Sequence, residues 1–455
     1  MRLLAAAGPA HADPSDPVTF VLLGEDGARI ARAITHDDHC PAIRIDGQGS
    51  AMTVRAPAGV MPLRPTQSDS TLSKPSVFDA LTCEALVPAS AQTASIAGHT
   101  LALPPARIDR IVVIGDTGCR LKAADKAYQA CNDAKAYPFA RVAAAAARWA
   151  PQLVIHVGDY LYRENPCSAD QTGCAGSVWG YGYDAWRADF FDPAQPLLAA
   201  APWAAARGNH ESCRRAGQGW WRFLDPRPLA AGHDCNDAAN DAVGDYSDPY
   251  AVPLGQDAQL ILFDSSNTTV KPFVQGDVAW DRYRDAYAKI DALSRRVTHS
   301  ILVDHHPLLA FGALRSPGGG VSLYPGNGGL QSAFGSLNPQ FTPPGIDLLL
   351  SGHIHVWEAV SFAPPFPAQV VAGFSGTQED IVPLPVAPPP GQTPAPGAVV
   401  QAFSSWVDGF GFMTLTRQGP DRWLAEIRDV DGAVVNTCQI AGRRLTCAVA
   451  QVSAP

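Results

Sequence analysis

The sequence predicts an α/β layered domain that is preceded by a smaller all-β domain. Strands and helices alternate from residue 107 onward, whereas residues 13–106 alternate short β-rich runs with turn clusters and lack long helical periodicity. In the second part, polar residues directly follow the predicted strands. Because such folds bind ligands at the carboxyl ends of their strands, we expect a functional site along that edge.

The individual elements follow from hydrophobic patterns. Residues 137–150 are rich in alanine with a proline near their start, and residues 277–297 place their apolar side chains on one stripe, so both segments predict helices. Within the domain at 107–455 we interpret two segments as inserted loops, 311–345 and the proline-rich 383–398. Short apolar runs predict strands at 18–23, 42–45, 52–55, 108–114, 153–157, 259–263, 300–303 and 347–350.

Composition and charge limit the class of protein. A hydrophobic content of 46% with 17% charged residues is typical of a globular chain rather than a disordered one. The net charge of −9 argues against a surface that binds nucleic acid or anionic membranes. No apolar run approaches the roughly 18 residues of a membrane-spanning helix. We therefore expect no nucleic-acid partner and no membrane span, and the sequence identifies no protein partner.

The 10 cysteines indicate export. Their number is even and none has C-x-x-C spacing, which argues against zinc and thioredoxin-type sites. Pairing in sequence order would close modest loops, with Cys40–Cys83 stapling the N-terminal domain, although other connectivities stay open. Residues 1–12 have one basic residue, a short apolar stretch and an Ala-x-Ala site, which indicates a truncated secretory signal, an ordinary disordered terminus being the alternative. A secreted or periplasmic protein is therefore expected.

Five short motifs carry the candidate chemistry, and each follows an apolar run or lies at a turn. Each is weak alone, because a Gly-Asp pair usually marks a turn and a lone buried histidine usually belongs to the core. Together they supply the carboxylate, imidazole and oxygen donors that hold two metal ions around a phosphoryl group. The motifs are Gly115-Asp116-Thr117-Gly118, Gly158-Asp159-Tyr160-Leu161-Tyr162, Gly208-Asn209-His210-Glu211, Asp304-His305-His306-Pro307 and Gly352-His353-Ile354-His355.

Over residues 107–435 these motifs resemble those of the calcineurin-like metallophosphoesterases, and most closely those of the purple acid phosphatases. General members of that superfamily have a histidine two residues after the first aspartate, where this chain has Gly118, and here Tyr162 stands three residues after Asp159. The resemblance implies a layered β-sandwich flanked by helices, in which the Tyr162 phenolate replaces the missing imidazole. We interpret the neighbouring Tyr160 as a packing residue.

The same resemblance implies two ligand sets, with Asp159 bridging two metal ions. The family histidine of the fourth motif precedes x-Pro, which selects His305 over His306. One ion, Fe(III), would be held by Asp116, Asp159, Tyr162 and His355. The other ion, Fe(II), Zn or Mn, would be held by Asp159, Asn209, His305 and His353.

The resemblance also gives candidates for catalysis. His210 would stabilise the transition state or protonate the leaving alkoxide, the alternative being that it orients Asn209. His306 either contacts phosphate or packs against its own loop. Other side chains have two open interpretations each. Arg214, Arg215 and Arg315 either assist phosphate binding or lie on the surface, residues 179–186 either form an aromatic wall or pack, and Glu211 and Glu358 are expected to accept hydrogen bonds rather than to catalyse.

The predicted reaction is that of an acid phosphatase acting on a small phosphorylated substrate. A phosphomonoester would be hydrolysed by a metal-bound hydroxide that attacks in line at phosphorus. One alternative is a phosphodiesterase or nucleotidase on the same site, because the metal ions do not distinguish the ester types. Another is a non-catalytic relative that binds phosphorylated ligands, against which the complete set of ligands argues.

Overall fold

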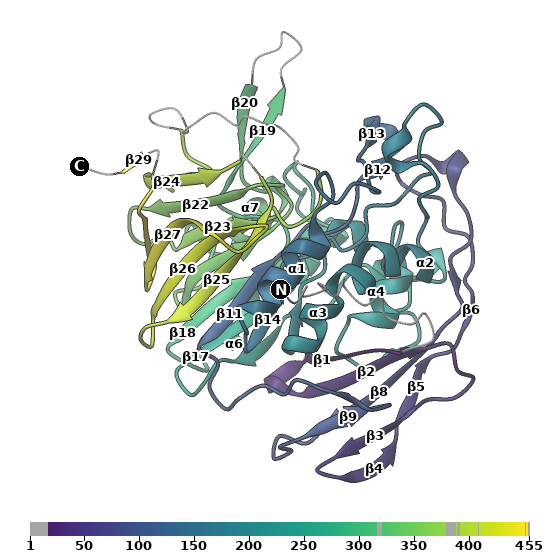
Figure 1. The fold of residues 1–455 in the computed structure, drawn as a ribbon. Coiled ribbons are helices and arrows are strands. Elements are labelled where there is room, and N and C mark those ends of the chain that lie inside the picture. Colours follow the sequence, from purple (N-terminus) through teal and green to yellow (C-terminus); the bar gives the residue numbers. More distant parts are fainter. Residues whose placement is uncertain are drawn as a thin grey trace, which may run out of the picture.

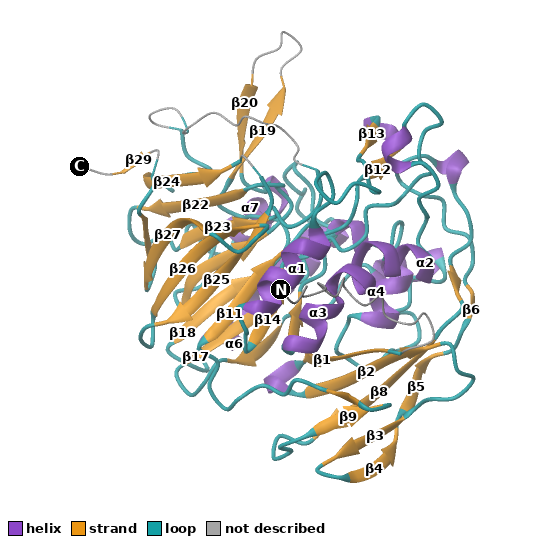
Figure 2. Cartoon of the chain, viewed as in Figure 1, coloured by secondary structure: helices purple, strands orange, loops and turns teal. Residues whose placement is uncertain are grey.

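The computed structural model describes residues 17–315, 321–378, 388, 392–407, 409–450 and 452–453. Two large β-sheets pack face to face, and helices cover their outer faces (Figures 1 and 2). This arrangement confirms the predicted α/β layered sandwich. None of the helices in the described ranges is long and apolar enough to cross a membrane.

The first sheet combines N-terminal and C-terminal strands around a parallel centre. Its strand order is β28 (Arg444–Cys447), β27 (Val434–Ala441), β26 (Arg422–Asp429), β25 (Gly411–Arg417), β11 (Arg110–Ile114), β14 (Leu153–His156), β15 (Trp203–Ala205), β1 (Val18–Leu23), β2 (Arg29–Thr35), β8 (Leu81–Val87) and β5 (Thr53–Ala56). The second sheet has a parallel centre as well. Its order is β16 (Tyr250–Pro253), β17 (Ala258–Leu262), β18 (His299–Val303), β21 (Ile346–Ser351), β23 (Ala368–Ala372), β22 (Trp357–Phe362), β24 (Val400–Trp406) and β29 (Val452–Ser453).

Smaller elements surround the two sheets. A third sheet contains β10 (His99–Thr100), β9 (Ala94–Ile96), β3 (Ala42–Ile45) and β4 (Gln48–Ala51). The two-stranded ribbons are β6 (Gly59–Val60) with β7 (Val77–Phe78), β12 (Leu121–Lys122) with β13 (Ala127–Tyr128), and β19 (Phe311–Arg315) with β20 (Val321–Pro325). The helices are α1 (Phe139–Arg148), α2 (Tyr183–Trp186), α3 (Asp192–Ala200), α4 (Gly217–Phe223), α5 (Asp241–Gly244), α6 (Val278–Ser294) and α7 (Gly328–Gly335).

Alternating side chains of the strands create the layers. In β11, Ile111 and Val113 enter the core between the two sheets, whereas Val112 and Ile114 enter a second core beneath α1, α3 and α4. The second sheet repeats this pattern, since Leu260 faces the first sheet and its outer face packs against α6 and α7. Successive side chains of a strand point to opposite faces, so a continuous apolar run marks a strand that is buried on both sides.

The N-terminal part is rich in strands, as predicted. Its strand β1 pairs in parallel with β15 through Leu22 and Trp203, and in antiparallel with β2, so this part extends the first sheet. Side chains also connect it to the rest of the chain, because the Arg55 Nη2 donates to the Trp221 carbonyl at 2.7 Å. A separate accessory domain over residues 13–106 stays a prediction, and residues 1–12 lie outside the described residues.

All of the predicted helices and strands occur, with ends shifted by at most three residues. The cysteines pair in sequence order, as Cys40–Cys83, Cys119–Cys131, Cys167–Cys174, Cys213–Cys235 and Cys438–Cys447. These bonds are typical of proteins from an oxidising compartment.

The segment 311–345 differs from the long loop that we predicted. It contains the β19–β20 hairpin, in which Gly312 lies opposite Tyr324, and the helix α7, whose first turn is capped because the Asn327 side chain accepts from the Leu330 amide at 2.9 Å. A Cβ on Gly312 would lie 2.0 Å from the Tyr324 ring, so this glycine makes room for a side chain rather than marking a loop. The other proposed insertion, 383–398, falls largely outside the described residues.

Candidate metal centre

The predicted ligands meet at one edge of the sandwich because parallel strands end there. In the first sheet β11 and β14 pair in parallel with Ile114 opposite His156, and Asp116 and Asp159 follow these strands closely. In the second sheet β18 and β21 pair in parallel and are followed by His305 and His353. The carboxyl ends of both sheets therefore deliver side chains into one site.

Sharp backbone turns aim these side chains inward. Asp116, Asp159 and His353 have φ values of 53°, 60° and 71°, a left-handed conformation that costs free energy for residues other than glycine. A Cβ on Gly208 would lie 2.0 Å from the Asp159 Oδ1. Glycine is thus required at this position so that the Asn209 segment can approach the Asp159 carboxylate.

The first cluster of donor atoms is centred on the Tyr162 hydroxyl. Its oxygen lies 2.9 Å from the Asp116 Oδ1, 2.7 Å from the Asp159 Oδ2 and 2.8 Å from the His355 Nε2. The His355 Nδ1 lies 2.8 Å from the Gln378 carbonyl, so Nδ1 carries the proton and Nε2 presents a lone pair to the cluster. One phenolic hydrogen cannot serve three acceptors, and this surplus of lone pairs fits a bound cation.

The second cluster shares the Asp159 carboxylate with the first. The His305 Nε2 lies 3.1 Å from the Asp159 Oδ2 and 3.0 Å from the Asn209 Oδ1, and the His353 Nδ1 lies 3.1 Å from the same Asn209 oxygen. The His305 Nδ1 lies 2.9 Å from the Val157 carbonyl, which leaves Nε2 as the ligating atom. Asp159 is therefore placed between two sets of donors that each fit a cation.

Burial dominates the electrostatics of the metal-free chain. It raises the pKa of Asp116, and together with both carboxylates it raises the pKa of Tyr162 well above the usual range. Burial opposes the charged form of His305 too, but the Asp159 carboxylate outweighs it and raises the pKa of His305 to about 9. A bound cation favours the ionised carboxylate and phenolate, so metal binding would release protons from this site.

The two candidate catalytic histidines lie beside the clusters. The His306 ring centroid is 4.2 Å from that of His353, and one ring nitrogen of His306 lies within 4.8 Å of ligating atoms of His305 and His353. The His210 ring packs on Tyr162 with centroids 3.7 Å apart, and its Nε2 lies 3.9 Å from the Asp159 Oδ2. Burial, reinforced by the Arg215 guanidinium, lowers the pKa of His210 to about 4.

Several supporting residues agree with the predictions or add to them. The Glu211 carboxylate accepts hydrogen bonds from the backbone amides of Gly208, Asp159, Tyr160 and Leu161. The Ser265 hydroxyl accepts hydrogen bonds from the His305 and His306 amides at 3.1 and 3.0 Å. Its position shortly after the predicted strand 259–263 was a sequence signal that could have identified it. Tyr160 packs as predicted, since its ring is stacked on His156 and its hydroxyl donates to the Ala206 carbonyl at 3.1 Å.

Arg215 was expected on the surface if it did not bind phosphate, and it is buried instead. Its guanidinium pairs with Glu164, which sequence reasoning missed because no motif contains it. Arg214 is exposed, and the Arg315 side chain lies outside the description. The aromatic segment at 179–186 mainly packs, because Tyr181, Tyr183 and Trp186 are buried in the core.

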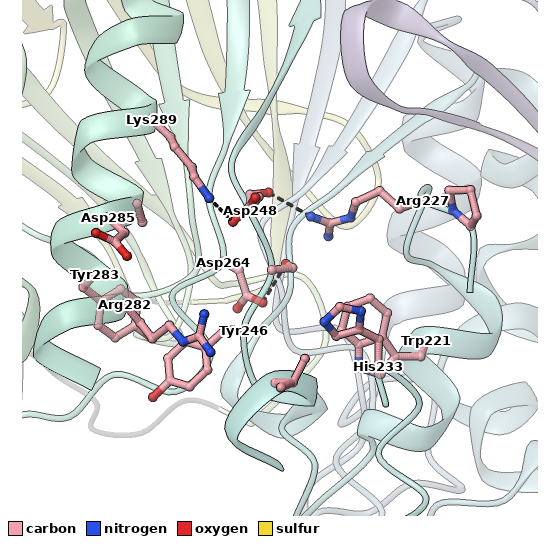
Figure 3. A pocket seen from close by; sticks show the side chains of 14 residues that line it. Trp221, Arg227, His233, Tyr246, Asp248, Asp264, Arg282, Tyr283, Asp285 and Lys289 are labelled. Carbon is pink, nitrogen blue, oxygen red and sulfur yellow. Dashed lines mark hydrogen bonds and ion pairs between the residues drawn. The ribbon is translucent and has the colours of Figure 1, made fainter. Parts of the chain in front are cut away.

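The structure also contains a cavity of about 370 Å³ (Figure 3). It is lined by side chains such as Trp221, Arg282 and Lys289, and none of the predicted ligands lines it. The Lys289 ammonium pairs with Asp248 at 2.6 Å. Part of the charge on the cavity wall is therefore balanced within the chain.

Comparison with known proteins places the chain in a family. A family model described as calcineurin-like phosphoesterase matches residues 109–357, and no curated protein matches the chain. The structure of purple acid phosphatase PPD1 from yellow lupin (Lupinus luteus) seeds is similar with a TM-score of 0.56 and 16% identity, over 94% of this chain and 75% of that one. The structure of PhoD is similar with a TM-score of 0.50 and 12% identity, over 97% of this chain and 94% of that one.

At these identities the two solved structures support the fold, and the family model supports the class of reaction. The prediction of a phosphoric ester hydrolase is confirmed at this level, and the metallophosphoesterase fold implies two metal ions. The match covers more than half of the sequence. The chain therefore belongs to the calcineurin-like phosphoesterase family.

Proposed function

We propose that this chain hydrolyses phosphomonoesters with two metal ions, as a purple acid phosphatase does, and that it is secreted or periplasmic. The supporting observation is the Tyr162 hydroxyl, which lies within 2.9 Å of atoms of Asp116, Asp159 and His355. Two carboxylates and an ionised phenol give hard, charged oxygen donors beside the imidazole, and such a set suits a trivalent iron better than zinc.

Two ligand sets are proposed, with Asp159 common to both. Fe(III) would be held by Asp116, Asp159, Tyr162 and His355. A divalent Fe, Zn or Mn would be held by Asp159, Asn209, His305 and His353. When bound, the two ions supply an activated water and positive charge for the phosphoryl oxygens.

The chain's own residues would orient these ligands and handle the leaving group. The Val157 and Gln378 carbonyls fix the tautomers of His305 and His355, so that each presents Nε2. We assign His210 to the leaving oxygen, because its Nε2 faces the Asp159 carboxylate from outside both ligand sets. His306 is assigned to a phosphoryl oxygen, since it lies beside His353 without belonging to either set.

Metal analysis and the visible spectrum of the purified protein test the proposal. We expect two metal ions per chain, one of them iron, and a tyrosinate-to-iron absorption band. Tyr162→Phe should lose the band, whereas the matched control Tyr160→Phe should keep it, because the Tyr160 hydroxyl bonds the Ala206 carbonyl instead. A protein that binds only zinc and is colourless when oxidised would show that the chain is not a purple acid phosphatase.

The ester type is tested with chromogenic substrates. The proposal predicts a higher kcat/KM for an aryl phosphomonoester than for the matching diester. The opposite order would assign a phosphodiesterase to the same site. Binding of phosphate without turnover of either ester, in a protein that holds both ions, would assign a non-catalytic relative.

A further inference from the structure

His210 is enclosed by buried polar side chains that belong to neither proposed ligand set. The Glu164 Oε1 lies 3.1 Å from the His210 Nδ1, and the Arg215 Nη2 lies 2.8 Å from Nδ1 and 2.6 Å from Nε2. Glu164, Arg215 and His210 are 1%, 6% and 5% exposed, so water contributes little to holding them in place. Arg215 and Glu164 are also in direct contact through the Arg215 Nη2 and the Glu164 Oε1.

The contacts of the ring determine which nitrogen carries the proton. The Nδ1 atom has two acceptors within reach, the Leu161 carbonyl and the Glu164 Oε1, both at 3.1 Å. The Arg215 Nη2 can only donate, and it lies closer to Nε2 at 2.6 Å than to Nδ1 at 2.8 Å. Together these contacts favour a proton on Nδ1 and a lone pair on Nε2. Nε2 faces the Arg215 guanidinium and also lies 3.9 Å from the Asp159 Oδ2, on the side of the proposed metal centre.

The ion pair is held by Tyr181, whose hydroxyl also contacts the N-terminal part of the chain. The Tyr181 hydroxyl donates to the Glu164 Oε2 at 3.1 Å and lies 2.6 Å from the Thr66 Oγ1. The Arg215 Nε donates to the same Glu164 oxygen at 3.3 Å. A buried ion pair repays its desolvation cost only when further hydrogen bonds satisfy it, and here both carboxylate oxygens are engaged.

We propose that the Glu164–Arg215 ion pair is a positioning unit for His210, which holds its ring with Nδ1 toward Glu164 and Nε2 toward the Asp159 carboxylate and the leaving group. Glu164 holds the Nδ1 side of the ring as a third group holds a catalytic base, while Arg215 neutralises that carboxylate. The inference rests on the proposed function of His210 and adds residues to it. Neither Glu164 nor Arg215 needs to touch the substrate.

A double-mutant cycle tests whether the pair acts through His210. Arg215→Lys keeps the charge but loses the forked contacts, and we expect kcat for an alkyl phosphate to fall about 10–100-fold, the cost of a misplaced group. KM should change little, and an activated aryl phosphate should be affected less because it needs little protonation. In the His210→Ala background the same change should cause no further loss. Additive losses would overturn the proposal, because Arg215 would then act on the substrate itself.

Two control variants separate positioning from general structural damage. Arg163→Lys disturbs another buried ion pair, Arg163–Asp189, which forms no hydrogen bond or ion pair with His210 among the described residues. The factor by which Arg163→Lys lowers kcat should be the same in the wild type and in the His210→Ala background. Arg214→Ala removes the exposed neighbour and should leave kcat unchanged. All variants should retain both metal ions, and if Arg215→Lys does not fold, Glu164→Gln provides the second entry into the cycle.

A measurement that does not depend on activity follows the tautomer directly. In the full chain, with its metal ions exchanged for diamagnetic Zn²⁺, the ¹⁵N signals of His210 are assigned by their loss in His210→Ala. We expect a protonated Nδ1 and an unprotonated Nε2 in the wild type, and a mixture of tautomers in Glu164→Gln. A wild type with a proton on Nε2 and none on Nδ1 would refute the positioning role even if the protein is a phosphatase. A wild type without phosphatase activity that keeps the Nδ1 tautomer would instead refute the proposed function alone.

Discussion

Glu358 offers a test of how burial alone sets a pKa in this fold. It lies on β22, is 1% exposed, and its Oε1 accepts from the Phe311 amide at 2.9 Å. Among the described residues its Oε2 has no hydrogen-bond partner. Burial raises the pKa of Glu358 from 4.5 to about 8, and the single amide contact opposes this only in part. The carboxyl group is therefore neutral in the folded chain at pH 7.

The effect on stability follows from proton linkage. The folded pKa is raised above the unfolded one, so the contribution of Glu358 is fully present below about pH 4.5 and is lost as the pH rises toward 8. At pH 7 the solution is 2.5 pH units above the ordinary pKa of 4.5, so Glu358 is ionised in the unfolded chain. At 1.36 kcal/mol for each pH unit, this ionisation stabilises the unfolded chain by about 3 kcal/mol. Glu358→Gln removes this ionisation, so its stability relative to the wild type should increase by about 3 kcal/mol between pH 4 and pH 7.

Chemical denaturation at several pH values measures this difference. The wild type and Glu358→Gln should differ least near pH 4 and increasingly up to pH 8, while Glu25→Gln, on an exposed glutamate, should follow the wild type throughout. Parallel curves for the wild type and Glu358→Gln would refute the reasoning. Glu358 would then be ionised in the folded chain, and burial would not be the dominant effect.

Further predictions concern ligands and disulfides. Metal analysis should find that His305→Ala has lost the divalent ion or holds it weakly. His210→Ala should keep both ions, and its kcat for substrates with poor leaving groups should be about 10²–10⁴-fold lower. The reverse pattern would mean that the two roles are misassigned. Mass mapping of non-reduced peptides should find no free thiol, and recovery of most cysteines as thiols would contradict both the pairing and the proposed export. Replacing Cys213 and Cys235 together by serine should lower the free energy of unfolding by about 3 kcal/mol, and an unchanged denaturation midpoint would contradict the stabilising role of this bond.

The sequence predicted eight of the strands and the sheet edge where the candidate site lies, because both depend on local patterns. The run Ile111–Ile114 is apolar at every position, and the residues that follow it carry the donor atoms. The same run indicates that its strand is buried on both faces, so other elements must pack against each face of the sheet. Pairing between distant strands has no such local signal. The parallel contact of β1 with β15 joins Leu22 to Trp203, and no periodicity in either segment indicates it.

The surroundings of the site were harder to predict for the same reason. Glu164 and Arg215 are 51 residues apart, and an arginine in a polar segment resembles a surface residue until its partner is known. The β19–β20 hairpin was missed because a glycine that makes room for Tyr324 has the same sequence signature as a flexible loop. In both cases the deciding contact is made by a residue far along the chain or across a turn.

Tyr160 and Tyr162 are both buried, and they differ in the number of acceptor atoms around the hydroxyl group. This number indicates a metal site better than burial does. Among the described residues the Tyr160 hydroxyl has one hydrogen-bond partner, the Ala206 carbonyl at 3.1 Å, and its single hydrogen satisfies that contact. The Tyr162 hydroxyl has three partners within 2.9 Å, and all of them present lone pairs. Burial raises the pKa of both tyrosines, so titration does not distinguish them. The excess of acceptors around Tyr162 does, because only a cation among them can turn mutual repulsion of lone pairs into attraction.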